Sequence, residues 1–120
     1  KVLLHLGMLS LREKEPAAAR GWFEKSLASQ PDAPGTLSAL GLAQAELNDG
    51  PGAYQSWTRA LELDPRQYDP LFNLAMLAGR MGRMDEARRA LQRFVASAPP
   101  DRFGVQISQA RQALRALPPG

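Results

Sequence analysis

An alanine, a large apolar residue and a proline recur together at intervals of 34 residues along this chain. In each set the large residue follows the alanine by four positions, as on one face of a helix, and the proline then stops the helix. The sets are Ala19, Phe23 and Pro31; Ala53, Trp57 and Pro65; and Ala87, Leu91 and Pro99. A long period held three times predicts a repeat architecture of stacked helical units.

Composition limits the classes of protein that this chain can form. Its 120 residues suffice for one domain with a modest core. The sequence contains no run of eighteen apolar residues, so we expect a soluble chain without a membrane span. The absence of cysteine excludes disulfides, thiolate catalysis and Cys-rich zinc sites, and it leaves the compartment open between cytoplasm and bacterial periplasm.

Arginine is concentrated in the last third of the chain. From Arg80 onward, eight arginines against three acidic residues give a net charge of +5, whereas residues 1–79 carry −2. A basic end can attract acidic proteins or nucleic acid. Most of these arginines fall on predicted solvent faces without interleaved exposed aromatics, so we expect a solvated surface and no nucleic-acid binding.

Three pairs of helices and a last helix follow from the pattern of apolar residues. The first residues already lie inside a helical pattern without a cap, which indicates a fragment of a longer protein or a start whose first residues are missing. We expect a turn at Asp49-Gly50-Pro51-Gly52, an N-cap at Asp69 before Pro70, and a left-handed C-cap at Gly82. The other expected helices run over about 1–14, 16–30, 34–48, 53–65, 85–98 and 102–116.

This pattern resembles the tetratricopeptide repeat, whose unit is a 34-residue pair of helices. The first helix of each predicted pair has leucines and a small residue at matching places: Leu3, Leu6 and Gly7; Leu37, Leu40 and Gly41; Leu71, Leu74 and Ala75. The departures are Ala75 for glycine, Leu91 for an aromatic residue, and Ser10, Gln44 and Ala78 where the family often has tyrosine.

The resemblance implies an all-α, right-handed superhelix of three antiparallel helix pairs plus a capping helix. It covers residues 1 to about 101, and the whole chain would form one domain. We expect repeats at about 1–33, 34–67 and 68–101, with the capping helix at about 102–116. Gly7 and Gly41 should admit a neighbouring helix closely, while Phe23 and Trp57 fill the remaining space.

The resemblance also indicates a working surface. The second helix of each pair carries an outward polar face, as with Arg20, Glu24 and Lys25, or Glu86, Arg89 and Arg93. The first helices carry an additional, mostly apolar stripe, which in this family lines a concave groove that grips peptides. The expected groove residues are Leu4, Met8, Leu11, Arg12, Ser38, Leu42, Ala45, Glu46, Phe72, Asn73, Met76 and Arg80.

Such a groove suits the apolar face of a partner helix or an extended apolar segment, with its arginines reaching for carboxylates. One subclass of the family clamps a terminal carboxylate with lysine, asparagine and arginine. The corresponding positions here are Leu4, Met8, Ala39, Asp69 and Asn73, and only Asn73 could donate a hydrogen bond. No such clamp is expected.

These residues favour a non-enzymatic protein-interaction scaffold without metal or cofactor. His5 is the only histidine and is expected to be a partly exposed packing residue, while Gly50 and Gly52 are not followed by the lysine of a phosphate-binding loop. Two alternatives remain open. The stripe, or the uncovered Leu3 and Leu6, could mediate self-association, and the chain could be the positioning arm of a larger enzyme whose catalytic domain lies elsewhere.

Overall fold

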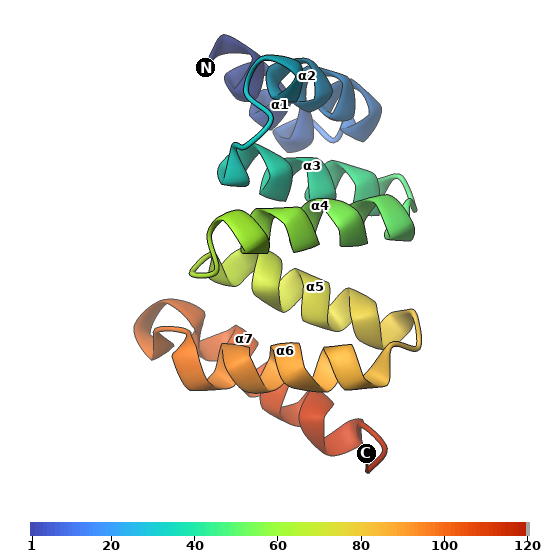
Figure 1. The fold of residues 1–120 in the computed structure, drawn as a ribbon, viewed down its shortest axis with the longest axis vertical. Coiled ribbons are helices and arrows are strands. Elements are labelled where there is room, and N and C mark those ends of the chain that lie inside the picture. The colour runs from blue at the N-terminus through green and yellow to red at the C-terminus, as the bar shows by residue number, and fades with distance from the viewer. Residues whose placement is uncertain (120) are drawn as a thin grey trace. The chain divides into compact units, whose positions relative to one another are not determined.

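The computed structural model describes residues 1–119, and this part of the chain is entirely helical (Figure 1). It contains seven helices: α1 (Val2–Arg12), α2 (Pro16–Ser29), α3 (Pro34–Glu46), α4 (Gly50–Leu63), α5 (Tyr68–Arg80), α6 (Met84–Ser97) and α7 (Pro100–Ala116). The all-α class expected from the sequence is therefore confirmed, and most helix ends lie within two residues of their expected places.

The helices form two compact units, the first from Lys1 to Arg66 and the second from Gln67 onward. In the first unit α1 packs against α2, α2 against α3, and α3 against α4. In the second unit α5 packs against α6, and α6 against α7. The expected single domain with repeats at about 1–33, 34–67 and 68–101 stays a prediction.

The first helix of each pair ends in the same backbone motif. Lys14, Asn48 and Gly82, spaced 34 residues apart, have φ angles of 62°, 61° and 79°. The amides that follow them donate to carbonyls five residues earlier, each at 2.8 Å: Glu15 to Ser10, Asp49 to Gln44 and Arg83 to Ala78. This is the Schellman arrangement, which turns the chain into the second helix of the pair. It confirms the left-handed conformation expected at Gly82.

Three expected helix starts are wrong. α4 begins at Gly50, because the Asp49 carboxylate caps it by accepting from the Gly52 amide at 2.9 Å. The expected turn is thus partly the first helical turn. Asp69 is not the N-cap of α5; Gln67 holds that place and Asp69 lies in the first turn, where its charge suits the helix dipole. α7 begins at Pro100, before the expected residue 102, and has non-helical φ/ψ angles at Phe103.

The close approach expected at two glycines is confirmed in the first unit. A Cβ added to Gly7 would lie 2.3 Å from Phe23 Cε1, and one added to Gly41 would lie 2.2 Å from Trp57 Nε1. Both aromatic side chains are buried, as are Ala19, Ala53 and Ala87. Each glycine therefore leaves the space that the aromatic ring of the following helix occupies. This packing places α1 close against α2 and α3 close against α4.

Candidate functional site

Four of the twelve expected groove residues line one hollow in the first unit. Leu11 comes from α1, and Leu42, Ala45 and Glu46 come from the last turns of α3. The hollow has a volume of about 320 Å³. Three of its four lining side chains are apolar, so it can receive an apolar group from another molecule.

Leu11, which lines the hollow, packs on the core of the first unit, as does the neighbouring groove candidate Leu4. Leu4 and Leu11 are half-buried and pack against the buried cluster that contains Phe23 and Leu40. Met8 and Leu42, by contrast, are 43% and 40% exposed. The apolar stripe thus has a fixed inner edge and an exposed outer edge.

The remaining expected groove residues of this unit are Ser38 and Arg12, which differ in exposure. Ser38 is half-buried, and its backbone carbonyl accepts a hydrogen bond from Trp57 Nε1 at 3.0 Å. Trp57 itself is only 2% exposed, which confirms its expected packing role. Arg12 is exposed at the last position of α1.

The other four expected groove residues lie on α5 in the second unit. Phe72, Asn73 and Met76 are half-buried, and Arg80 is exposed. The Phe72 ring centroid lies 5.2 Å from that of Phe94, which is fully buried. Phe72 therefore contributes to the core of its unit, a role that the sequence pattern did not indicate.

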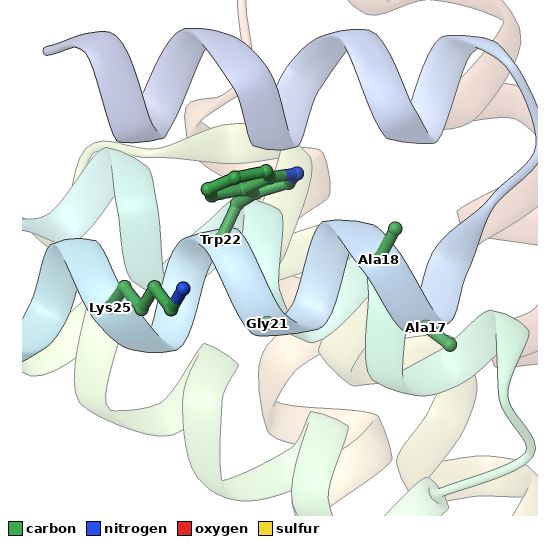
Figure 2. A pocket seen from close by; sticks show the side chains of 5 residues that line it. All are labelled: Ala17, Ala18, Gly21, Trp22 and Lys25. Atoms are coloured by element: carbon green, nitrogen blue, oxygen red, sulfur yellow. The ribbon is translucent and has the colours of Figure 1, made fainter.

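A second hollow, on α2, was missed by the sequence analysis. Ala17, Ala18, Gly21, Trp22 and Lys25 line a space of about 240 Å³ (Figure 2). Figure 2 shows the Trp22 ring extending from α2 toward α1, and the Lys25 ammonium lies 5.2 Å from its centroid. A tryptophan beside three small residues on the supposed polar face was the available signal.

The arginine-rich region is an exposed polar surface. Arg83 pairs with Glu86 at 3.6 Å, and Arg88 with Asp85 at 3.5 Å. Arg89, Arg111 and Arg115 are exposed. Exposed pairs of this kind contribute little to stability, on the order of 0 to 1 kcal/mol. That this surface does not bind nucleic acid stays a prediction.

His5 is exposed on α1, and its role as a partly exposed packing residue stays a prediction. In the part of the chain that the structure describes, no group of three or more His, Cys, Asp or Glu residues could hold a metal ion. The same part contains no helix that is both long and apolar enough to cross a membrane.

Comparison with known proteins connects this geometry to a family. The model of the tetratricopeptide repeat family matches residues 56–89, which run from α4 into α6. The chain contains a tetratricopeptide repeat (TPR). A search of curated protein sequences finds no significant match.

Solved structures share the TPR fold with nearly the whole chain. PcrH, in complex with the chaperone binding region of PopD, has 20% sequence identity and a TM-score of 0.84, over 95% of this chain and 86% of that one. The Arabidopsis OM64 TPR domain has 17% identity and a TM-score of 0.85, over 95% and 92%. The first TPR of Spaghetti (RPAP3), bound to the HSP90 peptide SRMEEVD, has 17% identity and a TM-score of 0.81, over 96% and 92%. The all-α solenoid class and the resemblance to TPR proteins are thereby confirmed.

Proposed function

We propose that this chain is a non-enzymatic interaction scaffold that binds an apolar or amphipathic segment of another protein along its first helices. The observation that carries the proposal is the hollow lined by Leu11, Leu42, Ala45 and Glu46. Structures of the same fold give further support, since PcrH is described with a region of PopD and RPAP3 with an HSP90 peptide.

Binding would use a surface that is already formed. Leu11 packs on the buried core cluster, so the floor of the hollow need not be ordered when a partner arrives. Met8 and Leu42 are exposed and would lose their contact with water. Fully burying a side chain of this size contributes about 1.5–3 kcal/mol, and a preformed site retains more of that gain. Methionine also adapts to irregular partner surfaces.

The α5 residues are proposed as a second contact region within their own unit. Met76 occupies the repeat position of Met8 and Leu42, and Arg80 occupies that of Arg12 and Glu46. Phe72 offers less surface to a partner than Met76 does, because its ring already packs on Phe94. A charged substitution at Phe72 would therefore disturb the core as well as any groove.

The test is binding of displayed random peptides of about 16 residues, some four helical turns in length, to the chain and to its Leu42→Glu and Met8→Glu variants. Sorting should yield peptides with an apolar face, and both variants should bind them at least about tenfold more weakly, the cost of placing a charge against an apolar group. Arg89→Glu, an exposed change on α6, is the control and should bind normally. Circular dichroism should be the same for all four proteins. If both groove variants bind the peptides as tightly as the wild-type chain does, the hollow is not the binding site.

Self-association is a second candidate, favoured by a difference between equivalent positions. Val2 and Leu9 on α1 are 74% and 40% exposed, whereas Thr36 and Ala43, their counterparts on α3, are 3% and 0% exposed. Packing of α2 against α3 accounts for the burial of the latter pair. Leu3 and Leu6, which we expected to be uncovered, are half-buried. Light scattering over a concentration series tests this candidate: a dimer lost in Leu9→Glu supports it, and a monomer throughout contradicts it.

A further inference from the structure

Glu46 has a charge opposite to that of its two counterparts in the repeat. Arg12 is the last residue of α1, Arg80 the last of α5, and Glu46 the last of α3. The C-terminal end of a helix carries partial negative charge, so arginine stabilises that end and glutamate destabilises it. Glu46 is therefore the unfavourable choice for the helix in which it lies.

No ion pair within the described residues 1–119 compensates this charge. Glu46 is exposed, and within residues 1–119 it has no ion-pair partner. It is also the only charged residue among those that line the hollow, whose other walls are Leu11, Leu42 and Ala45. A residue that violates a local rule without an internal compensation points to a functional role.

The carboxylate and the C-terminal end of α3 together make one end of the hollow electronegative. The rest of the hollow is apolar. A lysine or arginine side chain has both properties that this surface complements, because an aliphatic stem leads to a cationic head. An acidic residue would meet the repulsion of Glu46, and a purely aliphatic one would leave that carboxylate unpaired.

We propose that the hollow binds a lysine or arginine side chain of the partner segment. The stem lies against Leu11, Leu42 and Ala45, and the head pairs with Glu46 at the end of α3. This inference rests on the proposed peptide-binding function and specifies its partner: an apolar segment that carries a basic residue. Glu46 then determines specificity, while the leucines provide the apolar contact.

The experiment sorts the same displayed peptide library against the wild-type chain and compares binding by Glu46→Arg and Glu24→Arg. Both substitutions change the charge equally, but Glu24 lies on α2, outside the residues that line the hollow. We expect enrichment of lysine or arginine among apolar residues in the selected peptides. Glu46→Arg should weaken binding of these peptides about five- to tenfold, as for reversal of an exposed ion pair. Glu24→Arg should change their binding less than twofold.

Exchanging the charges of Glu46 and of the basic peptide residue tests their pairing directly. A selected peptide with its basic residue changed to glutamate should bind wild type weakly and Glu46→Arg more tightly. Glu46→Arg should also melt no lower than wild type, since arginine suits a helix C-terminus. Selected peptides without basic enrichment, or without loss on Glu46→Arg, would overturn this inference and leave the scaffold proposal intact. A library that yields no binding peptide contradicts the scaffold proposal itself.

Discussion

Replacing Gly41 by alanine adds one methyl group where α3 packs closely on Trp57 of α4. An ideal Cβ at this position lies 2.2 Å from Trp57 Nε1, 2.5 Å from Cδ1 and 2.6 Å from Cε2, whereas ordinary contacts begin near 3.4 Å. The indole must therefore move by roughly 1 Å, in a core where such overpacking costs about 1–3 kcal/mol. Trp57 cannot move freely, because it is buried and its Nε1 donates to the Ser38 carbonyl at 3.0 Å.

Two further effects change the expected stability of Gly41→Ala. Weakening the Trp57 hydrogen bond costs about 1 kcal/mol, and the better helix propensity of alanine returns about 1 kcal/mol. These terms roughly cancel, so Gly41→Ala should lower the free energy of unfolding by about 1–3 kcal/mol. The measurement is urea denaturation followed by circular dichroism. Gly21→Ala is the matched control: its added Cβ meets nothing within 4 Å, and it should be neutral or stabilising.

The third helix pair suggests a second substitution that should restore part of the lost stability. Ala75 and Leu91 occupy the positions of Gly41 and Trp57 there, and they are 1% and 2% exposed. Changing Gly41 to alanine together with Trp57 to leucine copies that combination into the second pair. The double variant should be more stable than the sum of the single changes predicts, with a coupling of about 1 kcal/mol or more. Additive losses, or a Gly41→Ala protein as stable as wild type, would refute the steric account.

Three more predictions concern helix ends. Lys14→Gly should raise the free energy of unfolding by about 0.5–1 kcal/mol, because Lys14 has a left-handed backbone that glycine adopts without strain; an unchanged urea midpoint would contradict this. Asp49→Ala should lower it by about 1 kcal/mol through loss of the bond from the Gly52 amide, whereas Asp49→Asn should largely retain stability. Glu46→Arg should raise it by about 0.3–1 kcal/mol at low salt and by less at high salt, and a lower stability would count against the dipole argument.

Packing inside each helix pair could be predicted from the sequence because it depends on residue size at a fixed period. Gly7 with Phe23 and Gly41 with Trp57 follow directly from that period, and the structure confirms both close approaches. The turns between the helices could be predicted only in part. The left-handed position was recognised at Gly82 but missed at Lys14 and Asn48, because neither residue is glycine and the motif is a property of backbone hydrogen bonds.

The candidate site was only partly accessible from sequence. Helical spacing brought Leu42, Ala45 and Glu46 together, and their proximity to Leu11 depends on how α1 and α3 pack. The contact of Phe72 with Phe94 could not be predicted because the two residues lie 22 positions apart on different helices, and helical periodicity describes only one helix at a time. The Trp22 hollow was missed because the neighbouring charged residues dominated the pattern of its helix.

The most direct test of the binding account is a nuclear magnetic resonance titration of the isotope-labelled chain with a peptide selected from the library. We predict shift changes concentrated at Met8, Leu11, Leu42, Ala45 and Glu46, which saturate together as peptide is added. Shift changes confined to the α2 hollow, around Ala17, Gly21 and Trp22, or to α7, with the signals of Leu42 and Ala45 unmoved, would contradict the binding proposal.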